Sequence, residues 1–377
     1  MSGILTINLA AVQQNWLGLG KRLVQTCECA AVVKANAYGL GVEAVAKSLA
    51  AAGCNSFFVA NLAEAKELRQ YLPDQTIYIL SGLRPGEESD CIQQGFIPVL
   101  VSWPQVLDWS QACRDLGAQA FCAIKVDTGM HRLGLTLQEF EALLKQPDLL
   151  LRCSPILIMS HLACADDADH PLNREQLICF RQCVDKIRVL VPTIKASLAN
   201  SSGIFLGADY HFDLVRPGIC LYGGNPTPGK DSPVQTVVTL ELPIIQIKTV
   251  TGPASVGYNA TYSIKAGEEK TLAIAAGGYA DGVFVHLSNK GSGIVAGHTV
   301  PIVGRVSMDS TIFDISALGS DAVNGLQAAY ISVLNETQTA DDVATAAQTI
   351  SYEVLTALGG RYTCHYLPVQ ESHVQQI

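Results

Sequence analysis

The sequence lacks the features that mark membrane, secreted and nucleic-acid-binding proteins. No apolar run reaches the roughly 18–20 residues that a membrane-spanning helix needs. The N-terminus, Met-Ser-Gly-Ile-Leu-Thr-Ile-Asn, has no basic region followed by an apolar stretch, so we expect no secretory signal and a cytosolic protein. Basic residues are also few: 25 Lys and Arg against 34 Asp and Glu give a formal charge of −9. That charge argues against nucleic acid or an anionic membrane as a partner.

The sequence also lacks any Cys-x-x-Cys pair, although it contains 12 cysteines. No second pair of ligands stands at zinc-finger spacing, so we expect no metal site. Reduced cysteines that act as small buried apolar side chains fit a cytosolic chain better. Charged residues make up only 16% of the chain and hydrophobic residues 49%, which excludes a disordered protein. A length of 377 residues suggests two domains, or one large barrel with an addition.

The first 220 residues alternate short apolar runs with longer helical patterns, such as Val42–Ala52, Leu62–Tyr71 and Thr136–Leu144. Eight of the runs are candidate strands: Cys29–Lys34, Ser56–Ala60, Thr76–Leu80, Pro98–Val101, Ala120–Lys125, Pro155–Ser160, Lys195–Ala199 and Asp213–Arg216. Eight strands with intervening helices fit a (β/α)₈ barrel, and a doubly wound sheet has the same local pattern.

Polar residues gather where these candidate strands stop, and they favour the barrel. They are Lys34, Lys125, Asp127, His161, Asn200, Ser201 and Arg216. In a barrel, all the carboxyl ends of the strands converge on one mouth, where active sites form. A doubly wound sheet would spread the same residues along an edge.

The pattern changes after Gly224. Residues 225–233, Asn-Pro-Thr-Pro-Gly-Lys-Asp-Ser-Pro, are rich in turn formers and end any regular element. The β-prone runs beyond them are Gln235–Leu242, Ile244–Val250, Thr271–Ala275, Gly293–Ala296, Val300–Val303, Ser310–Ile315 and Ala328–Val333, and Thr339–Leu358 has a helical pattern. We therefore predict an α/β fold, with a barrel over residues 1–232 and a mainly β domain over 233–377.

Lys34 ends an apolar strand, where a buried ammonium is costly unless it is paired or neutralised. Burial lowers the pKa of a lysine and makes its amine a competent nucleophile and base. The ordinary alternative is a lysine whose charged end reaches water from the strand end. The neighbours Tyr38, Gly39 and Gly41 favour a functional lysine, because they bring a hydroxyl and permit close approach of the backbone.

Residues 31–41, Ala-Val-Val-Lys-Ala-Asn-Ala-Tyr-Gly-Leu-Gly, closely resemble the cofactor-lysine segment of the alanine racemase family. The resemblance continues along nearly the whole chain. Its other blocks are Lys125–Gly134, Met159–His161, Asn200–Ser202, Val215–Ile219, Val256–Tyr262, Gly278–Gly282, Pro301–Asp309 and Tyr352–Val354. Members of this family pair a (β/α)₈ barrel with a mainly β domain. They work as head-to-tail homodimers in which the C-terminal domain of one subunit completes the active site of the other.

The resemblance implies that the protein interconverts L- and D-alanine, with Lys34 as the covalent anchor of pyridoxal 5′-phosphate. Racemisation needs a base on each face of the substrate Cα. Lys34 would serve one face, and Tyr258 of the other subunit would serve the opposite face. His161 matches the histidine that connects this tyrosine to Arg216. A supply of D-alanine for peptidoglycan is the usual role of the family.

The remaining site residues are also implied by the resemblance. Arg216 would face the pyridine nitrogen of the cofactor, and guanidinium does not readily protonate that nitrogen. The phosphate would be bound by Tyr38, Ser201, Tyr352 and the backbone N–H groups of Gly218 and Ile219. The substrate end would be formed by Arg132, Tyr279 and Met308. Lys125, which matches a lysine that is carbamylated in many members, and Asp309 would support these groups.

Two departures from the family pattern concern neighbours of these residues. Leu40 stands where histidine is frequent, and His131 stands where glycine is usual before Arg132. Three other functions stay open: a racemase that prefers serine or another amino acid, a pyridoxal-phosphate decarboxylase of the same two-domain plan, and a non-catalytic pyridoxal-phosphate carrier. The contexts of Tyr258 and Arg216 argue against the last two.

Overall fold

The computed structural model describes residues 3–319, 323, 325–326 and 329–369, which fall into two compact units. The barrel unit consists of residues Val12–Leu221 and Asn225–Val234. The second unit contains the described residues up to Ala11, Tyr222–Gly224, and the described residues from Gln235 onward. Among the described residues, no helix combines the length and the hydropathy that crossing a bilayer requires.

Seven parallel strands of the barrel unit lie in sequence order, as predicted. They are β3 (Ala31–Val32), β4 (Ser56–Val59), β5 (Thr76–Ile79), β6 (Ile97–Leu100), β7 (Cys122–Lys125), β8 (Pro155–Met159) and β9 (Lys195–Ser197). Every residue of β4, β6 and β7 is buried, because strands of a parallel barrel are covered on both faces. These strands therefore appear in the sequence as continuous apolar runs.

The eighth strand, β10 (Leu214–Val215), closes the ring. It pairs in parallel with β2 (Glu28–Cys29), which leads directly into β3. The N–H groups of Ala30 and Val32 donate to the carbonyls of Val215 and Pro217, both at 3.0 Å. On its other side, the N–H of Arg216 donates to the carbonyl of Ala199 at 3.0 Å. The predicted barrel is confirmed, and its first predicted strand is divided into β2 and β3.

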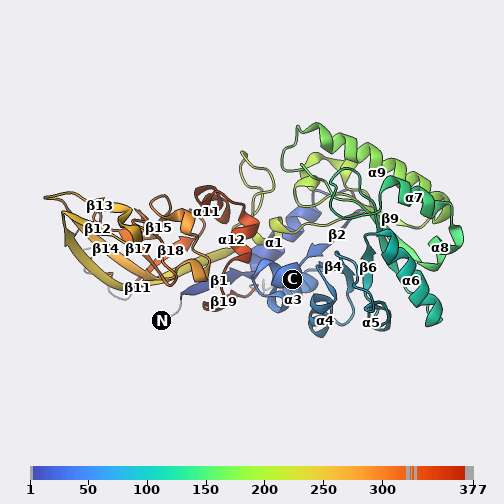
Figure 1. The fold of residues 1–377 in the computed structure, drawn as a ribbon, viewed down its shortest axis with the longest axis horizontal. Helices are drawn as coiled ribbons and strands as arrows, with labels where there is room; N and C mark the ends of the chain where they lie inside the picture. The colour runs from blue at the N-terminus through green and yellow to red at the C-terminus, as the bar shows by residue number, and fades with distance from the viewer. Residues whose placement is uncertain (1–2, 320–322, 324, 327–328, 370–377) are drawn as a thin grey trace, which may run out of the picture. The chain divides into compact units, whose positions relative to one another are not determined.

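The helices of the barrel unit lie around the outside of these strands, as the right-hand part of Figure 1 shows. They are α3 (Val42–Ala51), α4 (Leu62–Tyr71), α5 (Glu88–Gln93), α6 (Trp103–Asp115), α7 (Leu137–Leu144), α8 (Pro147–Arg152) and α9 (Pro171–Leu190), with α1 (Leu9–Gly20) preceding them. Local signals set their ends: Thr136 and Glu139 form a capping box at the start of α7. Eight of the twelve cysteines are buried as free thiols, in agreement with their expected role as small apolar side chains.

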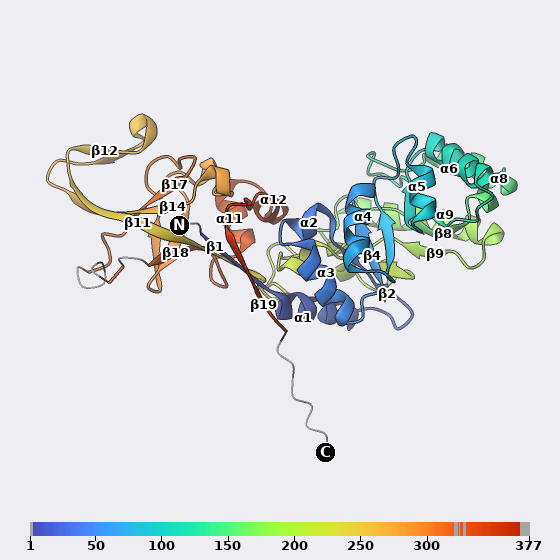
Figure 2. The same cartoon turned by 90° about the horizontal axis from the view of Figure 1, so that it is seen from below.

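The second unit is built around one long strand, β11 (Val238–Thr251), which Figure 2 shows running through the sheet. The sequence divided this strand at Pro243, and the structure instead has a register shift between Ile244 and Gln246. The first half of β11 pairs with β1 (Ile4–Asn8) and β18 (Tyr330–Leu334), and the second half pairs with β14 (Glu269–Ala276). The other strands of the unit are β12 (Ala254–Val256), β13 (Tyr262–Ile264), β15 (Ser292–Val295), β16 (His298–Pro301), β17 (Ser310–Asp314) and β19 (Thr363–Leu367).

The structure differs from the predicted organisation in two further places. The strand β1 groups with the second unit, although the prediction assigned residues 1–232 to the barrel, because β1 pairs with β11 and β19. The predicted helix Thr339–Leu358 is two helices, α11 (Ala340–Ala347) and α12 (Ser351–Thr356), because Gln348 adopts a left-handed conformation with φ +58°. The start of the predicted strand Ala328–Val333 lies outside the described residues.

Candidate active site

Lys34 follows β3 after one residue, Val33, and begins the short element α2 (Lys34–Tyr38), whose backbone beyond Lys34 forms a left-handed turn. Ala35, Asn36, Ala37 and Tyr38 have φ values of 54, 54, 53 and 57°. For an ordinary L-residue this conformation costs about 1–2 kcal/mol, so four in succession need strong local support. The N–H of Ala37 donates to the carbonyl of Val33 at 2.9 Å and so ties the turn to the strand.

Two side chains outside the strand provide that support. The carboxylate of Glu64 accepts the N–H of Ala35 at 3.0 Å and the N–H of Ala60 at 2.7 Å. The side chain of Asn36 accepts the N–H of Val42, the first residue of α3, at 2.7 Å. Lys34 is therefore held on a rigid part of the backbone rather than on a mobile loop.

The surroundings of Lys34 favour its neutral amine. Burial lowers the pKa of Lys34 below its usual value, and the nearby charge of Arg132 lowers it further, while Glu64 acts in the opposite direction. A lysine with a lowered pKa is a better nucleophile and a better proton acceptor at neutral pH. This is the electrostatic environment that the sequence argument predicted for a lysine at a barrel mouth.

Arg216 is buried, and its guanidinium contacts only neutral acceptors. It donates to the carbonyls of Ser160 at 2.6 Å and Leu198 at 3.3 Å, and to the hydroxyl of Ser197. Burial lowers the pKa of Arg216 from its usual value to about 9. A pKa two units above pH 7 leaves only about 1% of the guanidinium neutral, so Arg216 stays a cation at neutral pH.

Lys125 and His161 also lie at strand ends: Lys125 is the last residue of β7, and His161 comes two residues after β8. Burial lowers the pKa of Lys125 to about 8, with further contributions from Arg216, Arg132 and Lys34. Burial and the same surrounding cations hold the pKa of His161 well below its usual range. Close to neutral pH, His161 is therefore an uncharged imidazole, and about a tenth of Lys125 is an uncharged amine.

Arg132 is presented by a tight loop whose shape depends on Asp127. One oxygen of the Asp127 carboxylate accepts the N–H groups of Gly129, Met130 and His131, at 3.0, 3.0 and 3.1 Å. His131 has a φ of +55°, in the left-handed region that favours glycine. This left-handed conformation explains why glycine is usual at this position in the family. His131 adopts the same conformation at a cost in conformational free energy.

Ser201, Gly218, Ile219 and Tyr38 form a small polar cradle at the β9 and β10 ends. The Ser201 hydroxyl accepts the N–H groups of Gly218 at 2.9 Å and Cys220 at 3.3 Å. A side chain at Gly218 would collide with the hydroxyl of Tyr38, so only glycine keeps this hydroxyl beside the backbone N–H groups. Hydroxyl and backbone N–H groups of this kind suit a phosphate.

We call Lys34, Lys125, Arg132, His161 and Arg216 the mouth group, because the pKa shifts of its members show that they influence one another. The other predicted residues lie in the second unit, and we call Tyr258, Tyr279, Met308 and Tyr352 the edge group. Their exposed fractions are 67, 46, 52 and 39%. Exposed fractions this large leave much of each side chain open to contact with another molecule.

The edge residues come from short turns and one helix. Tyr258 begins the 3₁₀ turn η4 (Tyr258–Ala260), and Tyr279 begins η5 (Tyr279–Asp281). Tyr352 lies in α12, and Met308 precedes Asp309 just before β17. The 277–281 and 307–309 segments are joined by backbone hydrogen bonds, including Tyr279 N–H to the Ser307 carbonyl at 3.0 Å.

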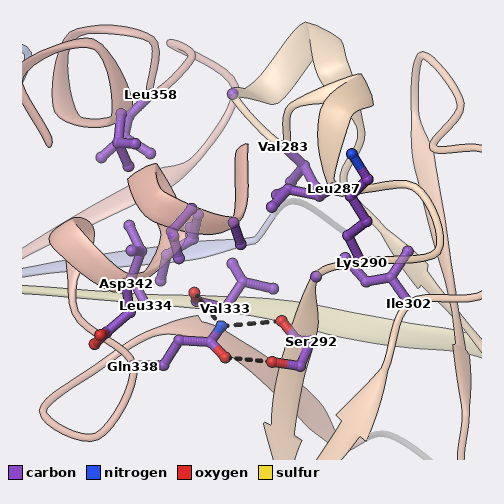
Figure 3. A pocket seen from close by; sticks show the side chains of 16 residues that line it. Val283, Leu287, Lys290, Ser292, Ile302, Val333, Leu334, Gln338, Asp342 and Leu358 are labelled. Carbon is purple, nitrogen blue, oxygen red and sulfur yellow. Dashed lines mark hydrogen bonds between the residues drawn. The ribbon is translucent and has the colours of Figure 1, made fainter. Parts of the chain in front are cut away.

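A pocket in the second unit, shown in Figure 3, contains none of the predicted site residues. It is mostly apolar, with Val283, Leu287 and Val333 among its lining residues. Among its polar lining residues, the half-buried amide of Gln338 donates to the Ser292 carbonyl at 2.9 Å and accepts from the Ser292 hydroxyl at 2.7 Å. Lys290 and Asp342 also line the pocket.

Sequence reasoning missed the residues that support the mouth group. Glu64 and Ser197 bind their partners only after the strands are assembled, and no local pattern marks them. Asp127 was predicted only as a polar residue at a strand end. Its position before Thr128 and Gly129 indicates a turn in which the Asp127 carboxylate accepts the following backbone N–H groups. Arg361, which binds both Asp281 and Asp309, was also missed.

Known proteins match this chain along almost its whole length. The family model for the alanine racemase N-terminal domain matches residues 7–226, and the model for the C-terminal domain matches residues 237–366. An alanine racemase of Rhodospirillum rubrum is 46% identical over 375 residues, which cover 99% of this chain and 98% of the relative. A catabolic alanine racemase of Agrobacterium fabrum is 44% identical, over 97% of this chain and 92% of the relative. The crystal structure of alanine racemase from Bartonella henselae with covalently bound pyridoxal phosphate superposes with a TM-score of 0.91 at 39% identity, over 97% of this chain and 100% of that one.

Proposed function

This chain belongs to the alanine racemase family, and we propose that it interconverts L-alanine and D-alanine with pyridoxal 5′-phosphate as cofactor. The observation that carries the proposal is Lys34 at the end of a buried strand, with a lowered pKa and a rigid left-handed turn behind it. A cytosolic homodimer that supplies D-alanine for peptidoglycan completes the proposal.

The residues of the mouth fit the cofactor in charge and in shape. Lys34, Lys125, Arg132 and Arg216 are cationic groups that lower the pKa values of their neighbours, so an anion among them is favourable. The hydroxyls of Ser201 and Tyr38 and the backbone at Gly218 and Ile219 suit the phosphate, and the Gly218 N–H, which donates to Ser201 in this structure, would exchange that partner for a phosphate oxygen. The amine of Lys34 suits the covalent link. Pyridoxal phosphate, when bound, supplies an electron sink that acidifies the Cα–H of an amino acid.

Two bases of this chain would move the proton. The Lys34 amine takes or returns the proton on one face of Cα, and the Tyr258 hydroxyl does so on the opposite face. Because Tyr258 is 67% exposed on its own chain, we propose that it acts in the site of a second subunit. The neutral His161 accepts or donates a hydrogen bond without adding a charge, which suits a link between Tyr258 and Arg216.

Arg216 and Arg132 would hold the two ends of the site. Arg216 keeps its proton at neutral pH, so it donates a hydrogen bond to the pyridine nitrogen without protonating it. That arrangement favours return of the proton to Cα and so disfavours transamination. Arg132, at the tip of the Asp127 loop, would bind the substrate carboxylate, and Met308 and Tyr279 would complete the substrate end from the other subunit.

A panel of amino acids in deuterium oxide tests this function. We expect uptake of deuterium at Cα together with loss of optical rotation for alanine, and weaker exchange for serine and larger amino acids. Loss of carbon dioxide from a basic amino acid would instead identify a decarboxylase. Bound cofactor with no exchange in any amino acid would identify a carrier.

The anchor is tested separately by reducing the purified yellow protein with borohydride. We expect the label on the peptide that contains Lys34, because its amine combines burial with a lowered pKa. A labelled peptide from any other part of the chain would remove the central assumption of the proposal. Lys34→Ala serves as the control, since it should neither hold the label nor racemise alanine.

A further inference from the structure

Arg361 joins three segments of the second unit through its guanidinium. Its Nε and one terminal nitrogen donate to the two oxygens of Asp281, at 2.7 and 2.8 Å. Its other terminal nitrogen donates to the Asp309 carboxylate at 2.8 Å. Asp281 ends the η5 turn that begins with Tyr279, and Asp309 directly follows Met308. One side chain thus binds both segments that carry proposed substrate contacts.

The link to Asp281 is structural. The Asp281 side chain is only 7% exposed, and its carboxylate also accepts the N–H of Gly278 at 3.0 Å. Its backbone carbonyl accepts the Tyr362 hydroxyl at 2.7 Å. A buried carboxylate held by a bidentate guanidinium is costly to break, because the remaining charge would lack a partner.

The link to Asp309 differs, because both side chains are exposed, Arg361 to 53% and Asp309 to 64%. Exposed ion pairs contribute little to the stability of a fold. The segments around Met308 are already joined by backbone hydrogen bonds, from Ala280 N–H to the Met308 carbonyl at 3.1 Å and from Gly277 N–H to the Asp309 carbonyl at 3.0 Å. The ion pair between Arg361 and Asp309 therefore orients the segment of Met308 and Asp309 and contributes little to the stability of the fold.

Gly278 shows how closely these segments approach. A Cβ atom at this position would collide with the carbonyl oxygens of Ser307 and Met308. A small displacement of either segment would therefore move Met308 relative to Tyr279. The hydrogen bonds of Arg361 to Asp281 and Asp309 add a side-chain link between these segments to the backbone hydrogen bonds.

We propose that Arg361 is a positioning residue for the substrate carboxylate: through Asp309 it fixes Met308, and through Asp281 it fixes Tyr279. This inference rests on the proposed function, in which Met308 and Tyr279 form the substrate end. The two links have separable effects, since the Asp309 link acts on substrate binding and the Asp281 link also acts on stability.

The test compares Asp309→Ala with Asp209→Ala. Asp209 forms a matched exposed pair with Arg181 at 2.7 Å, with exposures of 68 and 46%, and it belongs to no proposed site. We expect Asp309→Ala to raise the KM for L-alanine about tenfold with little change in kcat, since a misplaced binding group weakens ground state and transition state alike. Asp209→Ala should leave KM unchanged, and neither variant should change the melting temperature appreciably.

A second variant, Arg361→Lys, keeps the charge but cannot serve both carboxylates. We expect a KM at least as high as that of Asp309→Ala, together with a lower melting temperature. The double variant should have the KM of Arg361→Lys alone, because both changes break the same link. An unchanged KM in Asp309→Ala, or equal losses of kcat and stability in both single variants, would overturn the positioning role.

Propionate, an alanine analogue without the amino group, separates this inference from the proposed function. Its dissociation constant, measured by calorimetry on the pyridoxal-phosphate-loaded protein, should rise about tenfold in Asp309→Ala. This measurement needs binding alone. A wild-type protein that binds propionate but does not racemise alanine would refute the proposed function, whereas equal propionate binding in wild type and Asp309→Ala would refute the role of Arg361.

Discussion

The mouth group and the edge group use opposite physical means. The mouth group combines lysine and arginine side chains whose charges lower the pKa values of Lys34, Lys125 and His161. Glu64 and Asp127 bind the backbone of its loops, and the Ser197 hydroxyl accepts from the Arg216 guanidinium. The edge group consists of exposed side chains on short turns and one helix. The mouth group is thus prearranged within one chain, whereas the proposed role of the edge group requires a second subunit. The predictions below test this difference.

The largest loss of activity is expected when the proton-transferring base of either group is removed, Lys34 in the mouth group or Tyr258 in the edge group. Tyr258→Phe should reduce racemisation by about 10²–10⁴-fold, the usual contribution of a general acid or base, and Lys34→Ala should be at least as severe. Tyr258→Phe should also stop deuterium exchange from one enantiomer much more than from the other. Equal loss from both enantiomers would contradict the assignment of one base to each face.

Mixing these two inactive variants tests whether the groups come from different subunits. After random exchange of subunits, half of the dimers would be mixed, and each mixed dimer would have one intact site, so about a quarter of the wild-type activity should return. This recovery of activity is expected only if Lys34 of one subunit and Tyr258 of the other subunit act in the same site. A mixture that stays inactive after verified exchange would place both bases in one chain.

A change at Lys125, within the mouth group, is expected to have an effect of intermediate size. The neutral amine of Lys125 is favoured as the pH rises towards and above its pKa of about 8. This amine can add carbon dioxide to form a carbamate and release a proton. At fixed dissolved carbon dioxide, a ¹³C carbamate signal should therefore grow between pH 6 and pH 8, and it should be absent in Lys125→Arg. We also expect about a tenfold higher KM in Lys125→Met, because Arg132 would lose an anionic partner. A signal that persists in Lys125→Arg would assign the carbamate elsewhere.

The smallest effect is expected at His131, beside Arg132. His131→Gly relieves a φ of +55° but gives the unfolded chain more freedom and removes a contact with Asp127, so the unfolding free energy should change by less than about 1 kcal/mol. The KM for alanine should change less than it does in Lys125→Met. A loss of stability well above this range, measured by denaturant unfolding, would show that the His131–Asp127 pair at 3.6 Å holds the loop.

Part of the site could be predicted from the sequence because its chemistry is local. Lys34, Lys125, His161 and Arg216 each follow an apolar run, and a barrel brings such strand ends to one mouth. The shape of the Lys34 turn could not be predicted, because left-handed φ values at Ala35, Ala37 and Tyr38 contradict the usual preferences of these residues. Glu64 determines that turn from another helix, which no local pattern indicates.

The sequence by itself determined the eight parallel strands, the change to a β-rich second part and the residue types that suit pyridoxal phosphate, because these depend on periodicity and on side-chain chemistry. Only the tertiary structure decided that β1 belongs to the second unit, that burial lowers the pKa of Arg216 to about 9 and that of Lys125 to about 8, and that Arg361 binds both Asp281 and Asp309. Each of these depends on residues far apart in the chain, since strand pairing, desolvation and ion pairs arise only when the folded chain brings them together.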